Sequence, residues 1–281
     1  MNDVRPRRTA WRPSPLAIRV VSGVVLAALV VLLVAAGTWG IRVLAVVVAA
    51  LALWEFRVLS GKIGLLTPAW LLFPLGLWLT FSATLLKGIE LSLVLAVALA
   101  AGLTAFLFLS ARQQAVGRWS MALGGAVYVG IPLNCYLLIY AGAPTLGRAW
   151  LLFIIVGVVV SDVASLLIGM RFGRLPFFGD ISPRKTLEGA VGGVVCAVAV
   201  LLVGGYGVLG LQPQHAVALG VLIALSAQAG DLVESQMKRT AGLKDSSSLI
   251  PGHGGVLDRI DSVLFPPIVT YIYASAFHLL Q

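Results

Sequence analysis

Residues 149–170 read AWLLFIIVGVVVSDVASLLIGM and contain one ionisable side chain, Asp162. A helix that crosses a bilayer needs about 20 consecutive, mostly apolar residues, so this stretch predicts a membrane span. A carboxylate inside such a span is costly and usually marks a functional site. The stretch therefore predicts the class of fold and supplies a first candidate functional residue.

The rest of the chain has the same apolar character. Hydrophobic residues make up 59% of the 281 residues and charged residues 11%, with a mean hydropathy of +1.00. These values exclude an ordinary soluble domain. The nine candidate spans are 20–37, 40–56, 68–86, 91–109, 120–140, 149–170, 190–210, 215–230 and 262–280. The predicted fold is all-α, a polytopic integral membrane protein with about nine transmembrane helices.

Positive charge is concentrated in the connections between the spans. With a cytoplasmic N-terminus, only Arg42, Lys87 and Arg148 fall on the opposite side, which leaves 17 of the 20 Lys and Arg residues on the cytoplasmic side. This asymmetry is typical of inner-membrane proteins of the bacterial type, and we expect that location and orientation here. The net charge of +9 does not indicate nucleic-acid binding, because no basic patch with interleaved aromatic residues is present.

The chain divides into three parts by composition. Residues 1–19 form a basic tail, residues 20–148 hold the N-terminal transmembrane helices, and residues 149–281 form the predicted catalytic transmembrane region. This last region contains two long cytoplasmic loops, 171–189 and 231–261. Long connections in a compact protein tend to be functional. We therefore look for the site in these two loops.

Three smaller features bear on the helices themselves. Val34-Ala35-Ala36 follows an apolar run and could end a cleaved signal peptide, but eight further spans favour an uncleaved first helix. Cys135 and Cys196 lie inside predicted spans and are expected to act as small buried hydrophobic residues. The pair Gly189 and Gly193 either allows two helices to approach closely or belongs to a loop.

Polar residues gather around the segment 235–262, which reads SQMKRTAGLKDSSSLIPGHGGVLDRIDS. Five of the 11 acidic residues of the chain lie within residues 231–261. Four polar side chains at the end of the eighth span are spaced i, i+3, i+4 and i+7, namely Asp231, Glu234, Ser235 and Lys238. Side chains at this spacing share one helix face. They predict a polar cleft that faces the cytoplasm; the alternative is a solvated helix end.

Carboxylates in this segment predict a metal site. Asp258 and Asp261 are three residues apart at the start of the last helix, and with Asp231 they suit a hard divalent cation. Mg²⁺ takes one or two protein carboxylates and completes its shell with phosphates and water. Zinc is disfavoured, because His253 has no Cys or second His at ligand spacing. The alternative is pairing with Arg259, which cannot neutralise three acids.

Two short loop sequences predict phosphate binding. Pro251-Gly252-His253-Gly254-Gly255 lets the backbone approach a ligand closely, and clustered N–H groups can hold phosphate oxygens. A lone histidine is more often structural than catalytic, so both roles stay open for His253. In the other loop, Ser182 is a candidate helix cap before Pro183, which would place Lys185 where an anion binds.

Other acidic residues and absent motifs narrow the function further. Glu55 lies near a span end and is expected to make a structural hydrogen bond, whereas Asp180 and Glu90 are ordinary loop acids. The sequence has no Walker A loop, no strand-framed GxGxxG and no GxSxG elbow. The paired-aspartate signature of CDP-alcohol phosphotransferases is also absent.

The polar segments together resemble a known signature. It consists of Ser235-x-x-Lys238-Arg239, Lys244-Asp245, Pro251-Gly252-His253-Gly254-Gly255 and Leu257-Asp258-Arg259-x-Asp261-Ser262. In order and spacing this resembles the phosphatidate cytidylyltransferases, or CDP-diacylglycerol synthases. Residues 182–189 resemble a second motif of that family, and residues 230–235 resemble the lead-in to the signature. The resemblance covers about 160–193 and 228–263; the first 150 residues match only in hydropathy and span count.

The resemblance implies an enzyme that transfers the cytidylyl group of CTP to phosphatidate, releasing pyrophosphate and forming CDP-diacylglycerol for phospholipid synthesis. The catalytic residues implied are Asp231, Asp258 and Lys238, and the Mg²⁺ ligands implied are Asp231, Asp258 and Asp261. The substrate-binding residues implied are Ser182, Lys185, Glu188, Ser235, Arg239, Lys244, Asp245, His253 and Arg259. CTP, phosphatidate and membrane lipids are the expected partners. A monovalent cation beside Mg²⁺ and a homodimer are left open.

One departure and two alternatives accompany the resemblance. The family often has Asp-x-x-Ala-Tyr after the sixth span, but this chain has Asp162-Val163-Ala164-Ser165, so a tyrosine role is in doubt. A cytidylyltransferase for another lipid phosphate, such as an archaeal ether lipid, would use the same chemistry. A transporter is disfavoured, because its charges usually lie near the midplane of repeated halves, whereas these charges gather at one end.

Overall fold

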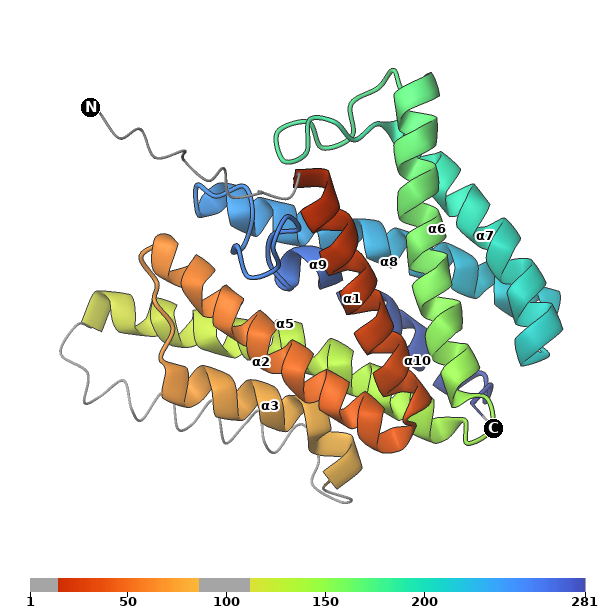
Figure 1. Cartoon of the computed structure of the whole chain (residues 1–281), viewed down its shortest axis with the longest axis horizontal. Coiled ribbons are helices and arrows are strands. Elements are labelled where there is room, and N and C mark those ends of the chain that lie inside the picture. Colours follow the sequence, from red (N-terminus) through yellow and green to blue (C-terminus); the bar gives the residue numbers. More distant parts are fainter. Residues whose placement is uncertain (1–14, 86–111, 281) are drawn as a thin grey trace, which may run out of the picture.

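The computed structural model describes residues 15–85 and 112–280, and it is helical almost throughout (Figure 1). The helices are α1 (Pro15–Ala35), α2 (Thr38–Lys62), α3 (Ala69–Leu85), α5 (Arg112–Gly142), α6 (Gly147–Phe172), α7 (Leu187–Leu209), α8 (Pro213–Thr240), α9 (Leu257–Leu264) and α10 (Pro266–Ala276). Within the described residues only two isolated β-bridges occur, Pro176 with Thr186 and Ile250 with Gly254. The all-α prediction is confirmed.

Five of the described helices, α2, α5, α6, α7 and α8, are long and apolar enough to cross a membrane. Two shorter apolar helices lie within α1 and α3. Large apolar side chains on α6 and α7 are exposed, among them Leu166, Leu167, Val195 and Val203. Extensive exposed apolar surface of this kind suits contact with lipid. The predicted span 91–109 and most of the basic tail lie outside the described residues.

Several predicted boundaries differ from the structure, most clearly in the C-terminal part. The last span, 262–280, is not one helix: α9 ends at Leu264, and α10 begins at Pro266. Pro266 and Pro267 lack the backbone N–H groups that would continue the hydrogen bonding of α9, and proline is favoured in the first turn of a new helix. Helix α8 also continues to Thr240, so the connection to α9 is shorter than the predicted loop 231–261.

Close approach of α6 and α7 depends on glycine. A Cβ atom on Gly193 would lie 2.0 Å from Ser165 Oγ, and one on Gly189 would lie 2.5 Å from the Ser165 carbonyl oxygen. Both distances are too short for any larger side chain at these positions. The predicted glycine pair is therefore a helix contact, in the most extensive helix interface of the described structure.

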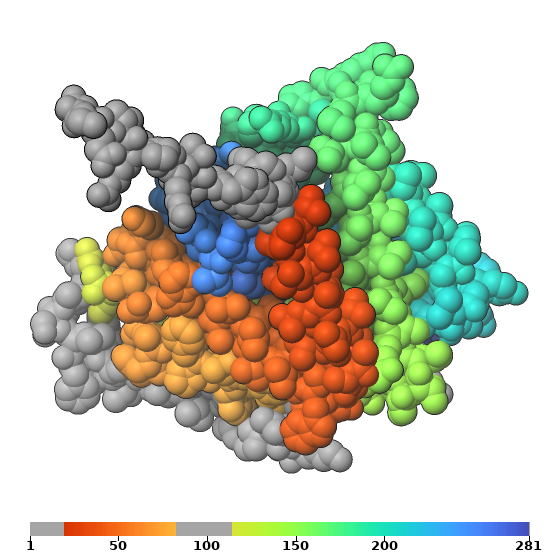
Figure 2. All heavy atoms as spheres, in the orientation of Figure 1, coloured from red at the N-terminus to blue at the C-terminus, as the bar shows by residue number. Residues whose placement is uncertain are grey.

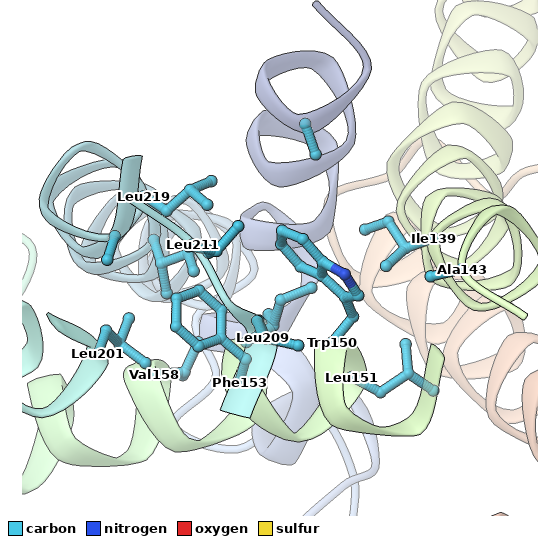
Figure 3. Close-up of a cluster of buried hydrophobic side chains, with 14 of the residues drawn as sticks. Ile139, Ala143, Trp150, Leu151, Phe153, Val158, Leu201, Leu209, Leu211 and Leu219 are labelled. Atoms are coloured by element: carbon cyan, nitrogen blue, oxygen red, sulfur yellow. The ribbon is translucent and has the colours of Figure 1, made fainter. Parts of the chain in front are cut away.

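One hydrophobic core joins α5, α6, α7 and α8 (Figure 3). Trp150 is fully buried and stacks edge-to-face on Phe153, with ring centroids 5.9 Å apart. Ile139, Leu201 and Leu219 pack around the two rings. This core occupies the first turns of α6 and α8, which fixes the relative positions of these helices. Their later turns carry the polar residues.

A second core joins the N-terminal helices to α9. Leu53 of α2 and Leu72 of α3 are fully buried with Leu257 and Leu264 of α9. Burying a leucine side chain contributes roughly 1.5–3 kcal/mol. In Figure 2 the blue atoms of the region before α9 lie directly against α1 and α2. The C-terminal polar segment is thus packed on the N-terminal part of the chain.

Candidate active site

The predicted polar face of α8 is confirmed. Ser235 Oγ donates to Asp231 Oδ1 at 3.2 Å, and the Lys238 ammonium forms an ion pair with Glu234 one turn earlier. Glu234 is fully buried, and the side chain of Lys238 is 14% exposed. A solvated helix end would leave both groups in water, so that alternative is wrong.

Lys238 also reaches α9. Its Nζ donates to Asp258 Oδ1 at 2.7 Å, and Asp258 Oδ2 accepts hydrogen bonds from Ser246 N at 2.8 Å, Ser246 Oγ at 2.9 Å and Gly255 N at 2.8 Å. Burial alone would raise the pKa of Asp258, but Lys238 and these backbone N–H groups outweigh it and lower the pKa. Asp258 is therefore a carboxylate with partners on both oxygens.

Glycines shape the loop that leads into α9. Gly252 and Gly254 have φ angles of 77° and 83°, in the left-handed region that favours glycine. A Cβ on Gly255 would lie 2.0 Å from Ser246 Oγ and 2.6 Å from the Glu55 carboxylate oxygens. The loop is thus folded onto protein carboxylates, whereas the sequence predicted that it holds phosphate.

His253 of this loop contacts α1. Its Nδ1 lies 2.9 Å from Ser22 Oγ, and Ser22 Oγ donates to the carbonyl oxygen of Pro251 at 3.0 Å. The Ser22 hydroxyl therefore lies between two groups of the loop, the Pro251 carbonyl and the His253 imidazole. These contacts give His253 a place in the packing of α1 on the loop. A contact with substrate stays a prediction.

Glu55 also binds this loop. This fully buried residue of α2 accepts hydrogen bonds from Ser247 Oγ at 2.6 Å and Val256 N at 2.9 Å on Oε1. Its Oε2 accepts from Ser246 Oγ at 3.0 Å and Leu257 N at 2.6 Å. The expected structural hydrogen bond is confirmed: three donors bind Glu55, and a fourth, the Ser246 hydroxyl, also lies 2.9 Å from Asp258 Oδ2.

The connection between α6 and α7 has a different local structure from the one predicted. Thr186, not Ser182, caps a helix: its hydroxyl accepts from Gly189 N at 3.2 Å at the start of α7. The carbonyl oxygen of Ser182 accepts from Lys185 N at 3.1 Å in a turn. Glu188 accepts from Arg174 N at 3.0 Å, so its carboxylate fixes the start of this connection. The predicted cap at Ser182 is wrong, because the helix begins later.

Lys185 links this connection to α8. Its Nζ lies 2.6 Å from Asp231 Oδ2, and both side chains are about a quarter exposed. The pair lies on a cavity of about 580 Å³ between α6, α7, α8 and the connection. Polar lining comes from Asp162, Ser165, Arg184, Lys185, Thr186, Gln228 and Asp231, and apolar lining from Leu166, Met170 and Phe177. The cavity therefore combines fixed charges with an apolar wall.

Three carboxylates interact at this end of the helices: Asp162 and Asp231 line the cavity, Asp231 pairs with Lys185, and Asp261 interacts electrostatically with both acids. Burial, and then the charge of Asp231, raises the pKa of Asp261 to about 6, with a further contribution from Asp162. Within the described ranges, Asp261 makes no ion pair, and its hydrogen-bond donors come from Ser262. In the same ranges no three His, Cys, Asp or Glu side chains form a metal centre on protein ligands alone. Two carboxylate ligands, Asp231 and Asp261, with substrate phosphates completing the coordination shell, would fit Mg²⁺.

The remaining predicted residues lie outside the cavity lining. Arg239, Lys244, Asp245 and Arg259 are exposed, and Arg239 Nε donates to the carbonyl oxygen of Ile181 at 3.5 Å. No ion pair involves these cations in the described part of the chain. The alternative interpretation required Arg259 to pair with Asp258 or Asp261, and neither pair is formed. Exposed cations that form no ion pair are available to bind anions.

Sequence reasoning missed Ser246, Ser247 and Gln228. Ser246 is almost fully buried between two carboxylates, and Gln228 lines the cavity and donates to the carbonyl oxygen of Ala190 at 3.0 Å. A run of three serines beside Asp245 was the signal for the first two. Gln228 is the polar residue one turn before Asp231 on the same helix.

Comparison with known proteins shows the family of the chain. The model of the Cytidylyltransferase family matches residues 17–277. The phosphatidate cytidylyltransferase of Mycobacterium bovis is 38% identical over 147 residues, which cover 51% of this chain and 47% of the relative. That of Helicobacter pylori is 41% identical over 146 residues, 52% of this chain and 53% of the relative. The chain thus spans about half the length of these curated relatives. On the match over most of its length, the chain belongs to the Cytidylyltransferase family.

Proposed function

We propose that this protein transfers the cytidylyl group of CTP to phosphatidate, forming CDP-diacylglycerol and pyrophosphate. The observation that carries the proposal is the cavity that joins Asp231, Lys185 and Asp162 beside exposed apolar helix faces. It offers charges for two polyanionic substrates next to a surface suited to acyl chains. The names of the relatives from Mycobacterium bovis and Helicobacter pylori support phosphatidate as the acceptor.

The chemistry requires positioning more than proton transfer. A phosphate monoester carries about −1.5 to −2 charges near pH 7, so the attacking oxygen of phosphatidate is already ionised. This oxygen bonds to the α-phosphorus of CTP, and the bond to the β-phosphate oxygen breaks, so that pyrophosphate leaves with the electron pair. The protein must hold two like-charged groups in line and stabilise the leaving charge.

Mg²⁺ is the proposed cofactor, with Asp231 and Asp261 as its ligands and Asp162 close by. When bound, it supplies positive charge that neutralises the phosphate oxygens of CTP. Asp258 is predicted as a third ligand, but its oxygens already accept hydrogen bonds from Lys238 Nζ, Ser246 N and Gly255 N, and Oδ2 shares the Ser246 hydroxyl with Glu55. We therefore assign Asp258 to the positioning of Lys238. Whether a monovalent cation binds beside Mg²⁺ stays an open part of the prediction.

Lys238 retains capacity for a phosphate. An ammonium group has three N–H donors, and Glu234 and Asp258 take two of them. The third is free to donate to a phosphate oxygen of a substrate held near Asp231. The exposed Arg239, Lys244 and Arg259 extend the positive surface and attract CTP from water.

Nine spans with the site on the cytoplasmic side remain our proposal for the topology. The structure places the side chain of Ser247 against Glu55, whereas Ser248 is exposed. Cysteine at Ser248, with Cys135 and Cys196 replaced by alanine, is expected to react with impermeant thiol reagents from the cytoplasmic side only. Labelling of intact cells from outside would contradict this orientation.

Product formation by the purified protein tests the function. Incubation with labelled CTP and phosphatidate is expected to give CDP-diacylglycerol and pyrophosphate in equal amounts, and only with Mg²⁺ present. Turnover of an ether-lipid phosphate in preference to phosphatidate would indicate the related lipid cytidylyltransferase. Absence of lipid product with every lipid phosphate would overturn the enzyme proposal.

A further inference from the structure

We propose that Glu55 is a positioning residue, which holds the connection between α8 and α9 and, through Ser246 and Asp258, the ammonium of Lys238. The part of this inference that concerns turnover rests on the proposed function. Glu55 lies in the N-terminal part of the chain, where the sequence showed no signature, and it contacts no residue of the cavity lining in the described hydrogen bonds.

The first step is that the N-terminus of α9 needs a hydrogen-bond acceptor. The first backbone N–H groups of any helix have no partner within the helix, and Val256, the N-cap of α9, provides no side-chain cap. Glu55 accepts from Val256 N at 2.9 Å and from Leu257 N at 2.6 Å. It therefore acts as the cap of α9 from another helix, and negative charge is favoured at that end.

The second step is the sharing of one hydroxyl. Ser246 Oγ lies 3.0 Å from Glu55 Oε2 and 2.9 Å from Asp258 Oδ2. A serine hydroxyl has one proton to donate, so the two carboxylates compete for it. The other oxygen of Asp258 accepts from Lys238 at 2.7 Å. Any movement of Glu55 therefore alters the partner that holds Lys238.

The third step is the special fit of a carboxylate. Each oxygen of Glu55 accepts one backbone N–H, which cannot rotate away, and one serine hydroxyl, which can. Glutamine would place its NH₂ group against one of the two backbone N–H groups, leaving that buried donor without an acceptor. A neutral isostere thus keeps the volume of the side chain but loses the anchor.

The test combines turnover with a measure of loop position that needs no activity. Ile250 is buried in the same connection, so the thiol of Ile250→Cys, in a chain without Cys135 and Cys196, reports how often the connection opens. Glu55→Gln is expected to raise the rate of thiol modification about tenfold, because an unsatisfied buried N–H weakens the closed state. It is also expected to lower kcat per folded molecule by up to about 100-fold, with KM for CTP little changed, since small misplacements have effects of that size.

Two further variants keep the inference falsifiable. Ser246→Ala is the variant to use if Glu55 cannot be replaced without unfolding. It removes the shared hydroxyl but retains Glu55, and it is expected to lower kcat about tenfold. Ser60→Ala is the matched control: it removes a buried hydroxyl from the same helix that binds Arg57 and Thr67 instead of the loop. It is expected to leave both thiol reactivity and kcat unchanged.

The outcomes separate the two proposals. Unchanged kcat and unchanged thiol reactivity in Glu55→Gln would overturn the positioning role. A fall in thermal stability with wild-type kcat per folded molecule would also overturn it, by showing a purely structural anchor. If the wild type makes no CDP-diacylglycerol, the proposed function fails, whereas the thiol comparison still shows whether Glu55 holds the loop.

Discussion

Asp231→Asn is expected to reduce cytidylyl transfer by about 10³-fold or more while the protein still inserts and folds. Asp231 is the proposed Mg²⁺ ligand that lines the cavity, and its carboxylate also holds Lys185 at 2.6 Å. An amide keeps the shape of the side chain but loses the charge that a metal ion needs. The expected loss corresponds to about 4 kcal/mol of transition-state stabilisation. Initial rates over a range of Mg²⁺ concentrations would measure it.

The control is the same chemical change at Asp180, an exposed acid of the connection between α6 and α7 that lies outside the cavity lining. Asp180→Asn is expected to retain wild-type rates and wild-type Mg²⁺ dependence. Activity of the Asp231 variant within a few-fold of wild type, at the same Mg²⁺ concentration, would remove Asp231 from the metal site.

Lys238→Ala is expected to lower kcat and kcat/KM together by about 10²–10³-fold, the usual effect of losing one donor to developing charge. The substitution also leaves Glu234 and Asp258 without their cation, and breaking such a buried pair destabilises by roughly 3–5 kcal/mol. Rates must therefore be expressed per folded molecule, with the folded fraction taken from thermal unfolding in detergent.

Added salt distinguishes a catalytic role of Lys238 from electrostatic attraction of CTP. If Lys238 only attracts CTP, KM should rise with kcat unchanged, and added salt should have the same effect on the wild type. Lys62→Ala is the matched control, because Lys62 is an exposed lysine in the last turn of α2 that forms no ion pair with Glu234 or Asp258. Wild-type constants for Lys238→Ala would exclude a role for this lysine in turnover.

The helices and one face of the site could be predicted because their signals are local. Apolar runs indicate spans, and the spacing of Asp231, Ser235 and Lys238 places them together on α8 whatever the rest of the chain does. The spacing of Gly189 and Gly193 suggested a helix contact but left a loop open as the alternative, and it did not indicate Ser165 as the partner.

Pairings across the sequence could not be predicted in this way. Lys238 and Asp258 each suited a substrate or a metal, but the path of the connection brings them within 2.7 Å of each other. The partners of Glu55 depend on how α9 packs on α2, and no periodicity records that packing. The cap at Ser182 failed for the opposite reason, because a favourable local preference yielded to the later start of α7 at Thr186.

The anchor at Glu55 has a consequence for synthesis of the protein. Its nearest partner along the chain, Ser246, is 191 residues away, and at about 5–20 residues per second a ribosome needs roughly 10–40 s to produce it. During that interval the α2 carboxylate has none of its final donors, and an unpaired charge is costly away from water. The newly made N-terminal helices must therefore keep this end hydrated until the last two helices emerge, so the polar end of the bundle closes late in biogenesis.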